Sequence, residues 1–397
     1  MLLRCVIYLL ALTTTVAQAA IITVGPGESI ERIAEAARIA QDGDTVLIKA
    51  GTYRGDVAVW TQKRLEIRGV GGRPVLVADG KSAEGKAIWV FRKGNYVVEN
   101  IEFRGARVRD GNGAGIRFEH GALQVFNCVF DANQTGILTA NFEDAELDIR
   151  SSVFTNAPRD GSRLPHLLYV GRIKRVTIEG SRFHNGFEGH LIKSRARLSE
   201  IRYNLIVDGP GGGASYEIDL PNGGDALLVG NVIGQSSDTQ NPVMVAFGAE
   251  GPNWPDSRLQ ISHNTLINEG WHPAWFVRSW QDKLPATAQI ITRNNLTVGL
   301  GLFTTTLTGN HRGNYPLLPG ALDPSQLDLV LEASSLLRGR VEPAESPLTP
   351  QAEFAFPWGT LPLPPVTSWA PGAFQGTEIP MASPSEATLS NINATSR

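Results

Sequence analysis

The sequence contains little cysteine, with two such residues among 397, and this scarcity excludes a small fold held together by several disulfide bonds. Cys5 lies within the first 19 residues, and Cys128 lies in the stretch FNCVF between apolar neighbours. A lone thiol in such a setting is most often a small buried side chain. Stability must therefore come from the burial of apolar surface.

Long apolar runs are also scarce, and the N-terminus holds the clearest one. Residues 1–19 combine Arg4, an apolar run over 6–17 and an A-x-A cleavage site that ends at Ala19, which is the pattern of a secretory signal. The run is too short to favour a membrane span. We expect an exported protein, periplasmic or extracellular, that keeps no membrane anchor after cleavage.

The chain as a whole lacks an excess of charge of one sign, since its formal net charge is −3, and this value by itself says nothing about partners. We expect no nucleic-acid partner. The distribution of charge is nevertheless uneven. Residues 150–202, named here the basic segment, hold eleven Lys and Arg against four acidic residues. Such a local excess predicts contact with an anionic ligand, and a merely solvated basic face is the alternative.

What the chain does contain is an internal repeat. A short unit of a turn residue and a strand recurs at intervals of 27, 24, 29, 24, 27, 33 and 31 residues, and an alternating apolar–polar run precedes each copy. The copies are ENIEF, FNCVF, RSSVF, EGSRF, RYNLI, VGNVI, SHNTLI and TRNNLTV, aligned on Asn100, Asn127, Ser151, Gly180, Asn204, Asn231, Asn264 and Asn295.

A second strand lies upstream of each unit, as in HLLYVGR, HLIKSRA and YEIDLP. Short strands without helical periodicity, repeated in this way, predict an all-β fold: a single-stranded right-handed parallel β-helix whose coils bury their inward side chains on one another. Asn side chains at the turns can then form ladders between coils. Residues 30–39 space their apolar side chains as a helix does, with Ser29 as the expected N-cap, and predict a helix that caps the N-terminal end.

The stretches AEAARIAQDGDTVLIKAGTYRG and LEIRGVGGRPVLVADG resemble the opening of secreted β-helix proteins of the pectate-lyase-like superfamily, most of all the branch with chondroitinase B and alginate lyases. The resemblance covers residues 22–300 and implies a right-handed parallel β-helix, which we place at 20–309. Beyond it we expect a Pro-rich segment that wraps the β-helix at 310–378 and a disordered tail at 379–397.

One stretch of the basic segment, GHLIKSRA at 189–196, puts three basic side chains into a strand-like sequence. Alternation along this strand, and along the equivalent strands of the coils before and after it, predicts a set of outward side chains on one face. Neighbouring strands lie about 4.8 Å apart, so the set would occupy a patch roughly 10 Å across. With Leu168, Ile192 and Ile218 inward, its members are Tyr169, Lys193, Arg195, Glu217 and Asp219.

Such a patch suits lyase chemistry on a uronate, in which a base removes the proton beside the sugar carboxylate, a cation neutralises that carboxylate and an acid protonates the leaving oxygen. Lys193 is the predicted base, because nearby cations favour its neutral form. Tyr169 or His190 is the expected acid, or Tyr169 is the base. Arginines hold carboxylates by paired hydrogen bonds, and sugar rings stack on aromatic faces. The expected substrate-binding residues are Arg195, Arg172, Arg197, His166, Trp271 and Trp275.

The family resemblance supports part of this assignment. In the chondroitinase-B and alginate-lyase branch an N-K-S lysine is the base, and Ile192-Lys193-Ser194 is similar to it. The arginine acid of that family, in an R-H-G motif, has no match on the next coil, where Asp219 stands in YEIDLPNGGD. The resemblance thus implies a base at Lys193 without the acid, and leaves open a divergent lyase or another enzyme.

Three functions remain open from the sequence. The first is a lyase acting on an anionic polysaccharide, and the second is a glycoside hydrolase with Glu217 and Asp219 as its carboxylate pair. The third is a β-helix that binds or assembles an exopolysaccharide without cleaving it. Glu217 and Asp219 would also suit Ca²⁺, the one cofactor under consideration, because hard cations prefer carboxylate oxygens. We expect a monomer.

Overall fold

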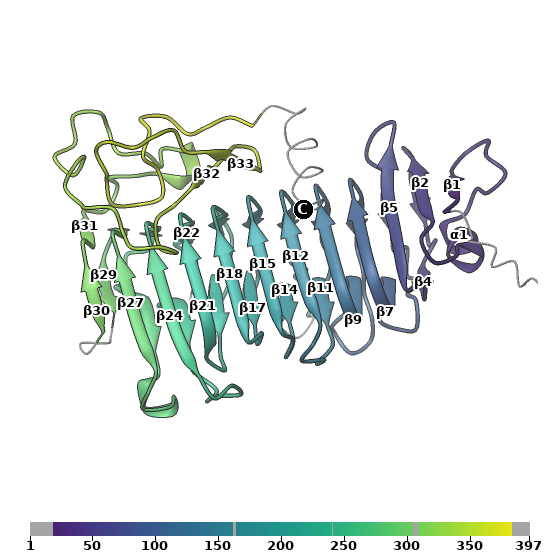
Figure 1. Ribbon diagram of the computed structural model, residues 1–397, viewed down its shortest axis with the longest axis horizontal. Coiled ribbons are helices and arrows are strands. Elements are labelled where there is room, and N and C mark those ends of the chain that lie inside the picture. The colour runs from purple at the N-terminus through teal and green to yellow at the C-terminus, as the bar shows by residue number, and fades with distance from the viewer. Residues whose placement is uncertain (1–18, 162–163, 240, 305–308, 383–397) are drawn as a thin grey trace, which may run out of the picture.

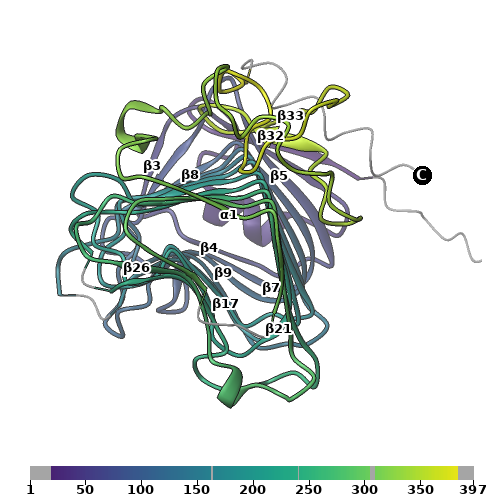
Figure 2. The same ribbon diagram turned by 90° about the vertical axis from the view of Figure 1, so that its left-hand side faces the viewer.

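The computed structural model describes residues 19–161, 164–239, 241–304 and 309–382, and in them the chain winds into a right-handed parallel β-helix. Figure 1 shows the coils stacked along the long axis, from β1 (Ile21–Val24) near the N-terminal end to β31 (Tyr315–Leu317) at the other. Figure 2, a view down this axis, shows that successive coils follow the same path. The predicted fold class is confirmed.

Each regular coil contributes one strand to each of three faces. The first and second faces belong to a single 20-stranded sheet, because two long strands run through both, and the third face is an 11-stranded sheet. The first face consists of β4 (Ala58–Trp60), β7 (Ala87–Glu99), β9 (Ala114–Phe126), β11 (Thr135–Thr139), β14 (His166–Val170), β17 (Ile192–Ser194), β20 (Ile218–Leu220), β23 (Val243–Phe247), β26 (Ala274–Ser279) and β29 (Gly301–Thr304).

The other two faces are built in the same way. The second consists of β1, β2 (Thr45–Lys49), β5 (Arg64–Val70), the later halves of β7 and β9, β12 (Glu146–Arg150), β15 (Arg175–Glu179), β18 (Leu198–Arg202), β21 (Gly224–Val229), β24 (Ser257–Ser262), β27 (Gln289–Arg293) and β30 (Asn310–Arg312). The third consists of β3 (Thr52–Arg54), β6 (Val75–Val77), β8 (Glu102–Arg104), β10 (Val129–Asp131), β13 (Val153–Thr155), β16 (Arg182–His184), β19 (Leu205–Val207), β22 (Val232–Gln235), β25 (Thr265–Asn268), β28 (Leu296–Val298) and β31.

The helix α1 (Ile33–Ile39) packs against β4 and covers the N-terminal end, as predicted (Figure 1). Its N-cap residue is Arg32 and not Ser29, and Arg32 makes no side-chain cap. The carboxylate of Asp56 does so instead, accepting hydrogen bonds from the backbone N–H groups of Ile33 at 2.6 Å and Ala34 at 2.9 Å. A residue more than twenty positions away therefore supplies the cap.

Two side-chain stacks run along the inside of the β-helix. Phe103, Phe130, Phe154 and Phe183 on the third face stack with centroid distances of 5.2, 4.6 and 4.7 Å. In the later coils, one corner of the core is polar. There the side-chain Nδ2 of each Asn donates a hydrogen bond to Oδ1 of the Asn in the next coil. This ladder of Asn204, Asn231, Asn264, Asn295 and Asn314 confirms the predicted ladder for the Asn of the last four copies.

The structure corrects the alignment of the repeat by one residue. In the first four copies, Asn100, Asn127, Ser151 and Gly180 occupy the left-handed turn position with positive φ. In the next copies that position belongs to Tyr203, Gly230, His263 and Asn294, and the ladder Asn follows it. The two kinds of Asn have different roles, since one adopts a left-handed turn and the other pairs buried backbone groups.

The C-terminal segment lies along the corner between the second and third faces (Figures 1 and 2). It contains the 3₁₀ turn η2 (Pro324–Gln326) and one antiparallel pair, β32 (Ala352–Phe354) with β33 (Thr360–Pro362), whereas the 3₁₀ turn η1 (Gln281–Lys283) lies between β26 and β27. Its apolar side chains pack on β19, β22 and β28. The β-helix itself continues through β31, so the segment expected from residue 310 begins inside the last coil.

Two expectations fall mostly outside the described residues. The expected signal sequence lies before β1, with 1–18 not described, and the expected tail is described only as far as Ala382. Met381 forms a bridge with Phe356, so the start of that tail pairs with the folded chain. Within the described parts of the chain, helices that are long and apolar enough to cross a membrane are absent.

Candidate functional site

Three successive strands of the first face, β14, β17 and β20, carry the candidate site. Their register places Tyr169 beside Lys193 and Lys193 beside Asp219, which confirms the predicted alignment. The same row of positions continues to Ala246 on β23 and Arg278 on β26. The site therefore lies on a regular sheet surface, where the strand spacing sets the distance between side chains.

Lys193 occupies the centre of the site and is 8% exposed. Its Nζ lies 2.9 Å from Oδ2 of Asp219 and 3.2 Å from Oε1 of Glu250. Asp219 is only 2% exposed, and its Oδ1 has no hydrogen-bond partner in the described part of the chain. We expected cations around this amine, but the structure places two carboxylates against it.

Arg195 is held on three sides. Its Nε donates to the phenol oxygen of Tyr169 at 3.0 Å, and its Nη1 donates to Oδ1 of Asn222. Nη1 and Nη2 also bind the two carboxylate oxygens of Glu250, at 2.6 and 3.1 Å. The indole of Trp254 donates to the backbone carbonyl of Arg195 at 3.1 Å. These contacts fix the plane of the guanidinium and turn its paired N–H groups towards a carboxylate.

The two carboxylates on Lys193 have opposite electrostatic environments. Burial raises the pKa of Asp219, and the charge of Lys193 offsets part of that rise. Burial also acts on Glu250, but the hydrogen bonds from Arg195 together with the charge of Lys193 outweigh it and lower the pKa of Glu250. Glu250 therefore stays ionised on the open side of the site, while Asp219 is the buried counter-ion.

Two histidines line the start of these strands. The rings of His166, His190 and Tyr216 stack with centroids 4.8 Å apart at each step. The backbone N–H of His190 donates to Nδ1 of His166, and that of Tyr216 to Nδ1 of His190, so each ring carries its proton on Nε2. Burial and nearby positive charge lower the pKa of His166 to about 3 and of His190 to about 2, which makes both neutral at neutral pH. Nε2 of His190 lies 3.3 Å from Asp219 Oδ2.

Glu217 points into the core, and the prediction that it shares the outer face with Asp219 is wrong. Its side chain is fully buried, and neither carboxylate oxygen has a hydrogen-bond partner among the residues described. The reason is that two consecutive residues, Glu217 and Ile218, point inward around the start of β20, as Leu191 and Ile192 do around the start of β17. Burial raises the pKa of Glu217 well above its usual range.

This orientation also removes the basis for two expectations, because Glu217 and Asp219 form neither a hydrolase carboxylate pair nor a Ca²⁺ site. In the described ranges, groups of three or more His, Cys, Asp or Glu that could hold a metal ion are absent.

Other predicted substrate-binding residues lie outside this hydrogen-bonded cluster. Arg172 and Arg197 are exposed at the turns after β14 and β17, and Arg172 pairs with Glu143 at 3.1 Å. Trp271 is 87% exposed in the loop before β26. Trp275 is half-buried on β26, two strands along from β20. The structure thus brings together Tyr169, His190, Lys193, Arg195 and Asp219, with His166 beside His190.

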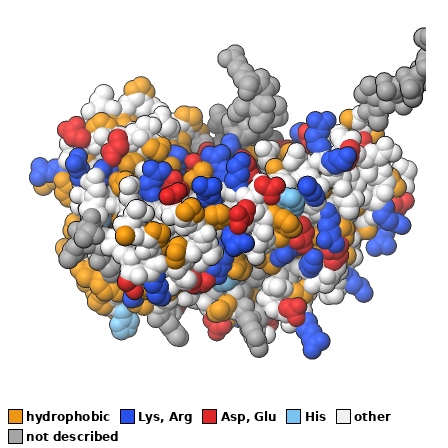
Figure 3. Space-filling view, turned by 60° about the horizontal axis from the view of Figure 1, so that its bottom comes forward, with side chains coloured by type: hydrophobic (Ala, Val, Ile, Leu, Met, Phe, Trp, Pro, Cys, Tyr) orange, Lys and Arg blue, Asp and Glu red, His pale blue; other side chains and the backbone are white. Residues whose placement is uncertain are grey.

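The positive charge of the basic segment is shared with acidic partners from the same and neighbouring coils. Figure 3 shows Lys and Arg side chains lying next to Asp and Glu side chains over the face that it presents. The pairs in and beside the segment include Arg150–Asp148, Arg172–Glu143, Lys174–Glu146 and Arg175–Glu200.

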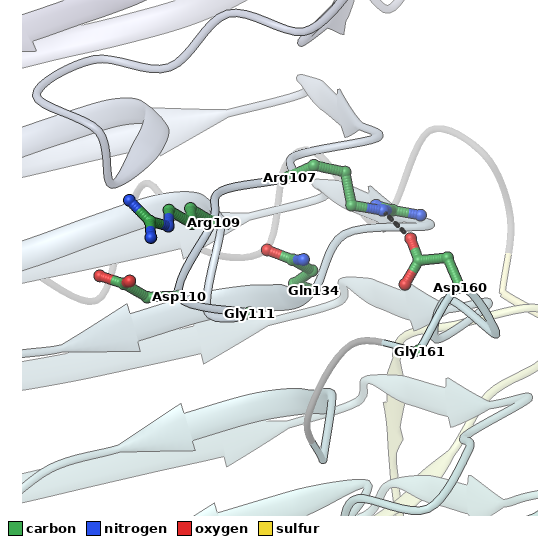
Figure 4. Close-up of a pocket in the computed structure, with 7 residues that line it drawn as sticks. All are labelled: Arg107, Arg109, Asp110, Gly111, Gln134, Asp160 and Gly161. Carbon is green, nitrogen blue, oxygen red and sulfur yellow. Dashed lines mark hydrogen bonds and ion pairs between the residues drawn. The ribbon is translucent and has the colours of Figure 1, made fainter.

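Two hollows border the strands of the first face. One, of 590 Å³, lies where β14, β17, β20 and β23 begin, next to Tyr216, and its lining includes Leu164, Phe187, Ser215 and Asn241. The other, of 770 Å³, lies further towards the N-terminal end; there Arg107 points to Asp160, while Arg109 and Asp110 lie to one side (Figure 4). The loop 156–161 and Leu164 belong to one connection, so the hollows follow each other along the axis.

Sequence reasoning missed Glu250 and Asn222, and it missed the contact of Trp254 with Arg195. All three lie in turns that follow first-face strands, where the alternation of a strand no longer applies. One signal was available, because Glu250 lies 55 residues after Arg195, which spans two coils from β17 to β23. A turn residue two coils away returns to nearly the same place on a β-helix.

Comparison with known proteins supports the fold. The structure is similar to the crystal structure of pectate lyase Pel9A, with a TM-score of 0.56 and 13% identity over 90% of this chain and 96% of that one. A mutant of the PL6 family alginate lyase AlyGC gives a TM-score of 0.39 and 15% identity over 75% of this chain and 40% of that one. No family model matches the sequence, and no curated protein matches it. The chain has a pectate-lyase-like parallel β-helix fold.

Proposed function

We propose that this chain is an exported enzyme that cleaves a uronate-containing polysaccharide by β-elimination, at the site formed by Tyr169, Lys193 and Arg195. One observation carries the proposal: Arg195 and Lys193 already bind a carboxylate together, that of Glu250, directly beside a phenol. A uronate needs the same surroundings, because its carboxylate must be neutralised before the neighbouring carbon loses a proton. A hollow of 590 Å³ lies where the same strands begin, next to Tyr216.

The contacts favour Tyr169 over Lys193 as the base. Lys193 sits between two carboxylates and serves better as a fixed positive charge, whereas Arg195 directs an N–H group at the phenol oxygen of Tyr169. A donor in that position stabilises negative charge on the oxygen. In this mechanism Tyr169 takes the proton from C5, the C4–O bond breaks as the C4–C5 double bond forms, and Tyr169 returns a proton to the leaving oxygen.

The test is absorbance near 235 nm, which reports the unsaturated product of elimination, on a panel of anionic polysaccharides. We expect Tyr169→Phe to lower the rate by a factor of about 10²–10⁴, the usual contribution of a general acid–base group. Tyr216→Phe is the matched control. It removes the hydroxyl of a different tyrosine, two coils further along, and leaves the partner of Arg195 in place. Equal rates in wild type and Tyr169→Phe would refute this mechanism.

A hydrolase is the second candidate, and one observation favours it. Asp219 and Glu250 both contact Nζ of Lys193, and their environments shift their pKa values in opposite directions, as in an acid and base pair. New reducing ends without absorbance near 235 nm would support this function. Binding of the polymer without either product would support a non-catalytic binding protein.

A further inference from the structure

Glu250 lies where an incoming carboxylate would have to bind. We infer that Glu250 is an internal stand-in for the substrate carboxylate, which a uronate must displace from Arg195 and Lys193, so that this residue sets the affinity and selectivity of the site. The inference rests on the proposed function for the identity of the ligand, but not for the displacement itself.

The geometry of Arg195 supports this role. Tyr169 and Asn222 hold Nε and one N–H of Nη1, and Glu250 accepts from the remaining edge with both of its oxygens. A planar carboxylate from outside would meet the same edge in the same two-point fashion. Glu250 is the half-exposed partner, with 46% of its side chain accessible, whereas the Arg195 side chain is 19% exposed. The acceptor is therefore the member of the pair that can leave.

The backbone around Glu250 is fixed, so only its side chain needs to move. The N–H of Glu250 donates to the carbonyl of Pro221 at 2.9 Å, and Nδ2 of Asn222 donates to the carbonyl of Gly251 at 2.9 Å. Lys283 Nζ donates to the carbonyl of Ala249 at 2.7 Å. A rotation of the Glu250 side chain towards solvent would free Arg195 and leave the turn in place.

The charges of the site explain which ligands can displace Glu250. Lys193 and Arg195 balance Asp219 and Glu250, so the site as it stands has no net charge to attract an anion. Swinging Glu250 away leaves one positive charge, which only an anionic ligand compensates. A neutral sugar cannot replace the two hydrogen bonds and the ion pair that Arg195 gives up, and the site therefore rejects it.

The experiment compares wild type with Glu250→Gln, which keeps the size of the side chain and removes its charge. Calorimetric titration with a galacturonate oligomer should show about three- to tenfold tighter binding by Glu250→Gln, the range expected for a half-exposed ion pair. Asp225→Asn is the matched control, because Asp225 forms a similar two-point pair with Arg258 on the second face. A methyl-esterified oligomer, which lacks the carboxylate, should bind to Glu250→Gln no more tightly than to wild type. Unchanged or weaker binding by Glu250→Gln would overturn the inference.

A second titration separates this inference from the proposed function. Acetate is added to both proteins while the Nε–H resonance of Arg195, identified by its loss in Arg195→Lys, is followed by NMR. Saturation at an acetate concentration about three- to tenfold lower in Glu250→Gln supports the stand-in role even if no uronate oligomer binds, and only the proposed substrate then fails. Equal acetate titrations would overturn the role of Glu250 whatever the polymer does.

Discussion

Replacing Lys193 by Met isolates the energy of the buried ion pair at the centre of the site. Met keeps most of the side-chain volume and removes the ammonium, so Asp219 would keep its charge at 2% exposure without its partner at 2.9 Å. Removal of one member of a buried pair typically costs about 3–5 kcal/mol. Nε2 of His190, 3.3 Å from the same oxygen, offers partial compensation, and we expect a loss of about 3 kcal/mol of unfolding free energy at neutral pH.

The sign of the pH dependence follows from the pKa of Asp219. Burial already raises this pKa above its unfolded value, and loss of Lys193 removes the main opposing charge. In the variant, stability therefore falls as the pH rises from the unfolded-state pKa of Asp219 to its higher folded-state pKa, and it is regained as the pH falls back through that range and the folded carboxyl binds a proton. The deficit of Lys193→Met relative to wild type should shrink as the pH falls.

Urea denaturation followed by tryptophan fluorescence measures both effects. The matched control is the double variant Lys193→Met with Asp219→Asn, in which neither group carries a charge, and we expect it to lie within about 1 kcal/mol of wild type. A single variant that loses less than about 1 kcal/mol, or the same amount at every pH, would refute the assignment of Asp219 as a buried charge held by Lys193.

Three further expectations concern the rest of the molecule. Asn231→Ala should lower the unfolding free energy by about 3–4 kcal/mol in the same urea assay, because it leaves the buried N–H of Asn204 and other ladder groups unpaired; a loss below about 1 kcal/mol would contradict the ladder as a source of stability. Burial raises the pKa of Asp208 to about 6, so its ionisation costs about 3 kcal/mol between about pH 4 and pH 7. Asp208→Asn should remove this pH dependence from the urea midpoint of unfolding. If the midpoints of the variant and of wild type changed in parallel with pH, Asp208 would not be the source of the dependence. Burial also raises the pKa of Cys128 to about 12, and with Cys5 replaced by Ser we expect no reaction with a thiol reagent until urea unfolds the chain; rapid labelling of the native protein would show the thiol to be accessible.

The row of Tyr169, Lys193 and Asp219 was predictable because three successive coils share one strand phase and one register. The alternation of inward and outward side chains failed at Glu217, two residues before Asp219. There the chain bends into the strand, and both Glu217 and Ile218 point inward. Periodicity describes the regular part of a strand, and a corner changes which side the next residue takes.

Repetition in the sequence determined the fold, because each coil buries its inward residues on equivalent residues of its neighbours. It also determined that repeated Asn residues would form a ladder. Tertiary structure alone decided which distant groups complete each local feature: Asp56 caps α1, Trp254 supports Arg195, and Glu250 pairs with Arg195 from two coils away. These partners lie in turns, where no sequence period fixes the direction of a side chain, and only the stacked coils bring them within hydrogen-bond distance.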